Sequence, residues 1–347
     1  MKKKRLIFAV IHIKQESNKK KNVKHSHILL YLLAMLPLFA TAQSGEGAYT
    51  ILRIPYSSRA AALGGNNISI IDDDITLAAH NPALLTNITD RTINLTYMTY
   101  MSDSKIAGAM FSKTLGERST GALSARYIDY GTFDGYTEDN IYTGTFSAKD
   151  FEFAIMYSYL LSDCWSGGVT GKFIYSKYES MSSIALGVDL GINYYNPDNE
   201  FSMSLAVKNL GGQVKAFEEK NEKMPVDLQM GFTKRLSHAP ILVSATLVNL
   251  HKWDKDDFYN ANGSEDSVGE LLLKHVILGA DVLIGQNFNI SLGYNYRIGK
   301  ELSVEGSKWD GFTTGAGLHI NKVKFGVSYS KLHISSSSLL FNLSYSL

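Results

Sequence analysis

The sequence predicts an all-β fold, a single-chain antiparallel transmembrane β-barrel of about 14 strands with a short N-terminal helical plug. Three observations support this prediction. The chain opens with an export signal, residues from 91 onward alternate between apolar and small or polar side chains, and short and long connections fall at opposite ends of the predicted sheet. We therefore expect a signal peptide over 1–42, a plug over 43–90 and a barrel over 91–347.

The first 42 residues have the pattern of a secretory signal. Lysines at Lys19–Lys21 and Lys24 precede the apolar run Ile28–Ala40, which leads into the small residues Ala40-Thr41-Ala42. An uncleaved anchor helix is the alternative, but the run is about 13 residues long, whereas about 20 are needed to cross a bilayer. Pro37 also interrupts it. We expect cleavage after Ala42.

Composition excludes several classes of protein. The 347 residues are 45% hydrophobic and 19% charged with a formal net charge of +1, which leaves no basic patch for nucleic acid. Cys164 is the only cysteine, so the exported chain is not held together by disulfides. No apolar stretch after the signal reaches the length of a membrane helix, so any further membrane contact must be made by strands.

Period-two alternation is clearest over 183–194. One face carries Ile184, Leu186, Val188, Leu190, Ile192 and Tyr194, and the other carries Ser183, Ala185, Gly187, Asp189, Gly191 and Asn193. The pattern returns over 288–298 and 339–347. A soluble β-sandwich also alternates. The second face, however, is small and polar with scattered charges such as Glu152 and Asp281, which suits a wet lumen behind an apolar, lipid-facing exterior.

Loop lengths separate a barrel from a sandwich. The strands are expected near 91–101, 104–114, 119–129, 145–161, 165–179, 182–195, 200–209, 226–236, 240–250, 273–284, 287–298, 311–320, 323–331 and 338–347. Connections after even-numbered strands are tight, whereas the long connections 130–144, 210–225, 251–272 and 299–310 all follow odd-numbered strands. Outer-membrane barrels sort their loops in this way, with both chain ends in the periplasm.

The segment before the barrel does not alternate. Ser58 to Leu63 followed by Gly64-Gly65 predicts a helical turn with a glycine stop, and Asp73 or Asp74 can cap a second short helix over 75–79 that ends before Asn81-Pro82. A compact helical piece ahead of a barrel is most simply a plug or hatch in its periplasmic mouth. Arg59 then either pairs with lumen carboxylates or is a solvated surface arginine.

These residues resemble a known family. Gly45 to Tyr49, Ile54 to Gly65 and Asn81-Pro82-Ala83 are similar to the N-terminal signature of FadL-like outer-membrane barrels, and more closely to the PorV/PorQ group of the type IX secretion system, with PorQ as the nearer pattern. The resemblance covers essentially the whole mature chain, but its motifs, with Arg59, Gly64, Gly65, Asn81 and Pro82 as the plug signature, are structural rather than catalytic.

The resemblance implies an outer-membrane protein of the cell-surface attachment complex. In that complex a PorQ-like barrel holds the surface protein PorZ beside PorV and the sortase-like PorU, and cargo is joined to an anionic lipopolysaccharide. Outer-membrane lipid and lipopolysaccharide are then further expected contacts. The motifs define no partner-binding residue. The loop residues Trp253, Phe258 and Tyr259 are candidates, because exposed aromatics at the cell surface suit a protein interface, and folding back on the barrel rim is their alternative.

Nothing in the sequence predicts catalysis. There is no G-x-S-x-G elbow and no Cys-His pattern around Cys164, and the histidines are dispersed without metal-ligand spacing. We expect no enzyme, no cofactor and no metal site. Two functions remain, a surface scaffold that anchors its partner through the long loops and a FadL-like transporter of hydrophobic small molecules. The transporter predicts an apolar pocket near Ile54 to Gly65, and the small, polar inner face disfavours it.

Overall fold

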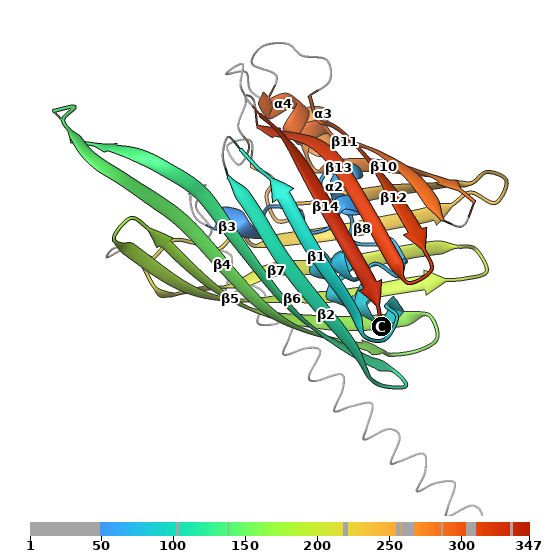
Figure 1. Ribbon diagram of the computed structural model, residues 1–347. Coiled ribbons are helices and arrows are strands. Elements are labelled where there is room, and N and C mark those ends of the chain that lie inside the picture. Colours follow the sequence, from blue (N-terminus) through green and yellow to red (C-terminus); the bar gives the residue numbers. More distant parts are fainter. Residues whose placement is uncertain are drawn as a thin grey trace, which may run out of the picture. The chain divides into compact units, whose positions relative to one another are not determined.

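The computed structural model describes residues 49–347, apart from 102–103, 138, 218–220, 255–257, 259–266, 286, 303–309 and 334–335. The predicted signal peptide, 1–42, lies outside the described residues. Within the described part of the chain, fourteen antiparallel strands form a closed barrel in which β1 pairs with β14 (Figure 1). None of the described helices has the length and hydropathy needed to span a membrane.

The strands follow one another around the barrel in chain order. They are β1 (Thr92–Thr99), β2 (Lys105–Gly116), β3 (Ser119–Tyr136), β4 (Tyr142–Leu160), β5 (Trp165–Tyr178), β6 (Met181–Asn196), β7 (Phe201–Lys215), β8 (Asp227–Arg235), β9 (Ile241–Leu247), β10 (Val276–Ile284), β11 (Phe288–Asn295), β12 (Phe312–Ile320), β13 (Val323–His333) and β14 (Ser336–Ser346). The predicted number and order of strands are confirmed.

The two faces of the wall are those that the alternation predicts. In β1, Leu95 is 56% exposed on the outside while its neighbour Asn94 is fully buried on the lumen side. In β6, Leu186 and Val188 face outward and Asp189 is buried within. An exterior of exposed apolar side chains is stable only in contact with hydrocarbon, and the closed sheet leaves no unpaired edge along the wall.

The loops agree with the prediction only in part. Tight turns follow the even-numbered strands, but the predicted loop 130–144 is largely strand, because β3 and β4 continue as a paired ribbon past the glycines that were interpreted as loop residues. β7 likewise continues to Lys215. After β11, helix α4 (Tyr296–Leu302) replaces the end of the predicted strand 287–298 and the start of the predicted loop, and helix α3 (Val268–Lys274) precedes β10.

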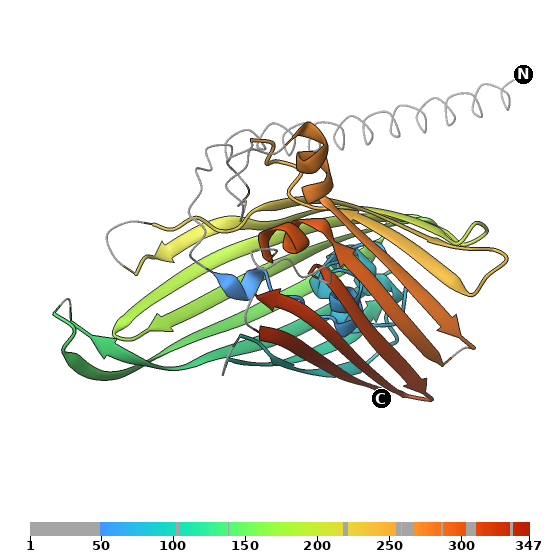
Figure 2. The same ribbon diagram turned by 90° about the horizontal axis from the view of Figure 1, so that it is seen from above.

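The N-terminal segment from Tyr49 to Arg91 lies inside the barrel and is called the plug below (Figure 2). It contains η2 (Thr50–Leu52), α2 (Ser58–Ala62), η3 (Ile75–Ala79) and η4 (Pro82–Asn87). The last three of these helices start at a polar cap, because Ser57 accepts from Ala60 N, Asp74 from Thr76 N and Asn81 from Ala83 N. The predicted short helix over 75–79 is confirmed, with Asp74 as its cap.

The hydrophobic core sits between the plug and the wall. Ile75, Leu77 and Leu84 of the plug are at most 1% exposed, and apolar plug residues pack against lumen-facing residues such as Met110 and Met156. Tyr49 bonds to Ser183 at the start of β6, on the side of the longer loops, whereas the plug ends at Arg91 beside the tight turns. The segment therefore fills the lumen from one end toward the other.

The plugged lumen as the candidate functional site

The plug packs directly on the backbone of the barrel wall. Eight strands each place a glycine opposite it, so close that a Cβ there would come within 2.8 Å of a plug atom. These glycines are Gly108, Gly168, Gly191, Gly231, Gly279, Gly293, Gly315 and Gly326, on β2, β5, β6, β8, β10, β11, β12 and β13. Because a larger residue at these positions would collide with the plug, these eight strands are shaped to hold this segment.

Gly64 and Gly65 form the turn that meets β10 to β12. Both have a φ of 96°, a conformation that L side chains rarely adopt, and they end α2 with Gly65 N donating to the carbonyls of Ala60 and Ala61. Gly64 N donates to Thr313 Oγ1 at 2.8 Å, and Asn295 Nδ2 donates to Gly64 O at 3.1 Å. Barrel side chains thus complete the hydrogen bonding of the turn.

Asn81 and Pro82 hold the opposite side of the plug. Asn81 Nδ2 donates to Ile68 O at 2.9 Å, and Asn81 Oδ1 accepts from Ala83 N at 3.0 Å. Both residues pack on glycines of β5 and β6, because a Cβ on Gly168 would overlap Pro82 and one on Gly191 would overlap Asn81. The signature residues are therefore docking residues on opposite sides of the lumen.

Arg59 pairs with a lumen carboxylate. Its Nη2 lies 2.8 Å from Oδ2 of Asp281 on β10, whose side chain is fully buried, and its Nη1 contacts Asp72 of the plug. Burial alone would lower the pKa of Arg59, but the negative charges of Asp281 and Asp72 outweigh it and raise that pKa above its usual value. The guanidinium therefore stays charged and ties α2 to the wall.

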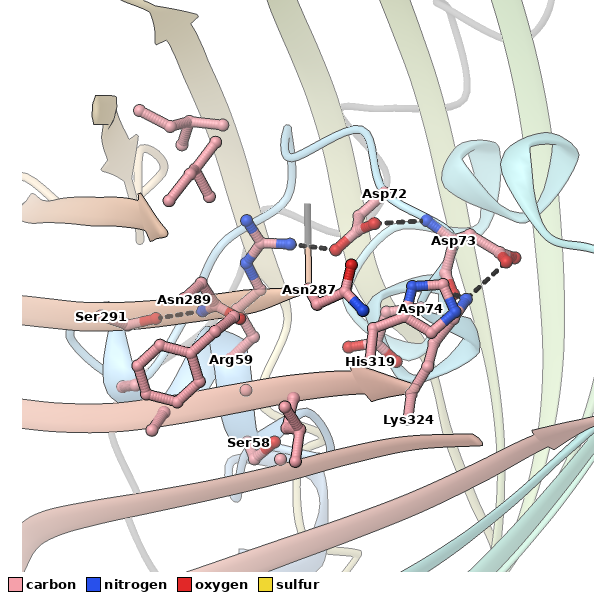
Figure 3. A pocket seen from close by; sticks show the side chains of 18 of the residues that line it. Ser58, Arg59, Asp72, Asp73, Asp74, Asn287, Asn289, Ser291, His319 and Lys324 are labelled. Atoms are coloured by element: carbon pink, nitrogen blue, oxygen red, sulfur yellow. Dashed lines mark hydrogen bonds and ion pairs between the residues drawn. The ribbon is translucent and has the colours of Figure 1, made fainter. Parts of the chain in front are cut away.

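A cavity of about 580 Å³ lies at the tight-turn end, between the plug and β6–β14. Figure 3 shows Arg59 reaching Asp72 and Lys324 reaching Asp73 across it, with Asn287 and His319 nearby. Apolar residues also contribute to its lining, but the side chains that bridge it are charged. The cavity therefore carries ion pairs beside an apolar part of its lining.

On the other side of the lumen, Arg126 of β3 holds the start of the plug. It donates to Ile54 O at 2.9 Å and to Ile51 O, pairs with Glu152 Oε2 at 2.6 Å, and lies 5.4 Å from the ring centroid of Tyr56. Its side chain is 6% exposed. Arg126 therefore joins wall and plug, although it was not among the residues that the sequence singled out.

Arg126 begins a row of charges that alternate in sign on consecutive strands. Glu152 on β4 follows it, then Lys172 on β5 and Asp189 on β6, which pair at 2.6 Å. Lys208 on β7 and Asp227 on β8 stand opposite each other in the strand register and extend the row. These lumen charges are thus balanced mainly within the wall.

His80 connects two turns of the plug. Its Nε2 accepts from the backbone N–H groups of Tyr56 and Ser57 at 3.3 and 3.4 Å, so the proton is assigned to Nδ1, which donates to Asn66 Oδ1 at 2.8 Å. Burial, followed by the positive charges of Lys208, Arg126 and Lys172, lowers the pKa of His80 well below its usual value. His80 is therefore neutral.

Comparisons with known proteins agree with this architecture. No family model matches the chain, and no curated protein matches it in sequence. Among solved structures, the chain is similar to the toluene transporter TodX of Pseudomonas putida, with a TM-score of 0.52 and 14% identity over 84% of this chain and 98% of that one. For the toluene transporter TbuX of Ralstonia pickettii the TM-score is 0.51, with 12% identity over 85% and 98%. For a FadL homologue of Pseudomonas aeruginosa it is 0.50, with 10% identity over 83% and 98%.

The chain has the fold of a FadL-like outer-membrane barrel. At this level of identity the similarity establishes the fold alone, and that part of the sequence resemblance is confirmed. The finer assignment to the PorV/PorQ group stays a prediction.

The candidate loop residues lie at the other end, before β10. Trp253 is 48% exposed, and its ring stacks on His275 at 4.4 Å between centroids. Phe258 is only 6% exposed and lies edge-on to the same histidine, with Lys274 and Arg297 near its ring face. The expectation of an exposed Phe258 is therefore wrong, because the ring folds back on the rim. Tyr259 lies outside the described residues.

Metal binding has no candidate group here. Among the residues that the structure describes, no group of three His, Cys, Asp or Glu side chains is placed to hold a metal ion. What the lumen offers chemically is a set of hydrogen bonds and ion pairs that fasten a plug.

Proposed function

We propose that the chain is a plugged outer-membrane barrel that anchors a protein at the cell surface. In the terms of the sequence resemblance, it is the PorQ-like component of the type IX attachment complex and holds a PorZ-like partner beside PorU and PorV. The signature Ser58 to Gly65 with Asn81-Pro82 supports the assignment. Its location is the outer membrane, with the longer loops at the cell surface.

The observation that carries this proposal is how the plug is fastened. Glycine-lined contacts occur on eight strands, and ion pairs hold the plug through Asp281 and Lys324 on one side and hydrogen bonds through Arg126 on the other. In a transporter, either the plug must move or the substrate must have a path around the plug. An anchor instead benefits from a barrel whose interior is rigid and closed.

The test uses the native cell. The gene is deleted, and the proteins on intact cells are compared with those of the wild type by surface biotinylation and quantitative mass spectrometry. We expect a specific surface protein of the PorZ type to leave the cells and to return when the wild-type chain is restored. An unchanged set of surface proteins in the deletion strain would exclude the anchoring function.

A FadL-like transporter of hydrophobic small molecules is the second candidate, favoured by the fold shared with TodX and TbuX. It predicts an apolar pocket near Ile54 to Gly65. The cavity beside Ser58 and Arg59 is instead bridged by charged side chains. Uptake of radiolabelled toluene by deletion and complemented strains separates the candidates, since a difference between the strains supports transport.

A further inference from the structure

The β3–β4 ribbon projects beyond the rest of the barrel. β3 and β4 are 18 and 19 residues long, and Figures 1 and 2 show their hairpin passing the rim alone. Pairing of β3 with β2 ends at Asp129, and pairing of β4 with β5 ends at Ala148. At about 3.3 Å per residue, the part of β3 from Asp129 to Tyr136 extends roughly 20 Å further.

The ribbon is ordered by its own cross-strand contacts. Phe133 and Phe146 stack with their ring centroids 5.5 Å apart, and Tyr136 meets Tyr142 edge-on at 5.6 Å. Such pairs stabilise a two-stranded ribbon, which is otherwise marginal in water and gains from a third strand. The surface that this ribbon presents is therefore held in strand conformation before anything binds.

The outer edge of β4 in this ribbon carries open backbone groups. Glu179 N donates to Ser147 O at 3.0 Å, so Ser147 directs its backbone toward β5. Direction alternates along a strand, so Thr145 directs its N–H and C=O to the same side, beyond the end of β5. Among the described residues, no backbone hydrogen bond from another strand reaches this edge over Tyr142 to Phe146. An edge of this kind pairs with another strand.

The two edges of the ribbon differ in how they are protected. The β3 edge carries Asp134 and an irregularity of register after Asp129, and Ser104 Oγ donates to Tyr130 O beside it. The β4 edge reads Tyr-Thr-Gly-Thr-Phe-Ser over 142–147, with no charge, lysine or proline, and its one irregularity lies near the tip, at Thr143. Natural proteins block exposed edges with charges and prolines, and this one is left unblocked.

We infer that the β4 edge over Tyr142 to Phe146 is a docking edge that takes one β-strand of a cell-surface protein. The strand adds to the sheet in line with β5, and its main-chain groups bond to those of Thr145. The hairpin lies at the end of the barrel opposite the first residue of β1 and the last residues of β14, which is the cell-surface end of such barrels. This inference rests on the proposed anchoring function and names the element that performs it.

The test replaces Thr145 with proline, which removes its outward N–H. Asp134 pairs directly with Thr145 and directs its backbone to the opposite edge, so Asp134→Pro is the matched control, and Thr145→Ala keeps the N–H. Deletion of the gene identifies the surface protein that the chain retains. The amount of that protein on intact cells is then measured for each variant. We expect Thr145→Pro to lower the retained amount at least about tenfold, and both controls to retain it within about twofold. Equal loss in Asp134→Pro, or full retention in Thr145→Pro, overturns the inference.

A second measurement does not depend on how proline is tolerated. Thr145→Cys in a Cys164→Ser background is labelled on intact cells with a maleimide that carries a photoreactive benzophenone, which inserts into C–H bonds of a neighbouring chain on irradiation, and Asp134→Cys serves as the control. A crosslink from position 145 alone to a strand of a surface protein supports the edge, whereas no crosslink, or one to a second copy of this chain, overturns it. If deletion of the gene itself leaves the surface proteins unchanged, the anchoring function fails. If deletion releases the partner and Thr145→Pro retains it, only the docking edge fails.

Discussion

On the β10–β13 side of the lumen, charged side chains of the plug form ion pairs with charged side chains of the wall. On the β3–β8 side, the charged side chains of the wall pair mainly with one another. Arg59 meets Asp281 and Asp73 meets Lys324 on the first side. On the second, Lys172 meets Asp189, and the plug contributes mostly backbone carbonyls and neutral side chains. Asp281 thus takes its countercharge from the plug, whereas Asp189 takes its countercharge from the wall. We therefore expect changes of charge on the β10–β13 side to affect docking of the plug more.

Gly293→Val is the change expected to disturb this attachment most. A Cβ on Gly293 would overlap the backbone of Leu63 and Gly64, which cannot swing aside as a flexible side chain can. We expect docking of the plug to weaken by at least about 3 kcal/mol. Hydrogen–deuterium exchange of the plug amides in detergent measures it. Gly171→Val is the control, because a Cβ on Gly171 meets nothing within 4 Å, and equal exchange in both variants would contradict the prediction.

Asp281→Asn tests the charge on the same side. The substitution leaves Arg59 paired with Asp72 of the plug, whose side chain is 43% exposed. We expect a loss of about 2–3 kcal/mol in plug docking, since a buried charge loses its buried partner. The double variant Arg59→Met with Asp281→Leu should recover most of the loss. If the single and double variants exchange alike, the ion pair does not fasten the plug.

Lys172→Met makes the corresponding change on the β3–β8 side. It leaves Asp189, which is 2% exposed, without its cation, although Asn209 N still donates to that carboxylate at 2.7 Å. We expect the free energy of unfolding of the barrel in urea to fall by about 2 kcal/mol. The folded fraction is measured from the gel mobility of unheated samples, which differs from that of heated, unfolded samples. The plug amides should exchange as in the wild type. Faster exchange there would show that this wall row also holds the plug and would remove the contrast between the two sides.

The sequence predicted the wall better than the contacts inside it. Alternation places Leu186 outside and Asp189 inside regardless of any partner, because a side chain in a strand has only two faces to choose from. The cap at Asp74 was also predicted, since capping is local, whereas the helix that Asn81 caps was not predicted. Asp281 stood out as a lumen charge and Arg59 as a candidate to pair with one. Their pairing joins positions far apart in the chain, and no local signal fixes it.

The misses have physical causes as well. Arg126 and Lys324 occupy lumen-facing positions of the alternation, so their side was predictable but their plug partners were not. The wall glycines looked like ordinary small residues of a wet lumen, although they are places where the plug backbone approaches. Loop 130–144 was misassigned because Gly131 and Gly144, both with positive φ, lie within ribbon strands rather than ending them.

The smallest expected effect is a pH dependence of docking centred on His80, which lies near Arg126, Lys172 and Lys208 on the β3–β8 side. Its pKa is lowered in the docked plug by burial and by nearby cations, whereas a released plug would have the ordinary value of about 6.5. The released form therefore binds protons first as pH falls below about 6.5, and docking weakens by at most about 1.4 kcal/mol per pH unit. Burial raises the pKa of Asp74, which has the opposite effect on docking. Exchange of the Tyr56 and Ser57 amides, corrected for intrinsic rates, should rise between pH 7 and 5.5 in the wild type and stay flat in His80→Asn. A parallel rise in both proteins would assign the pH dependence to another group.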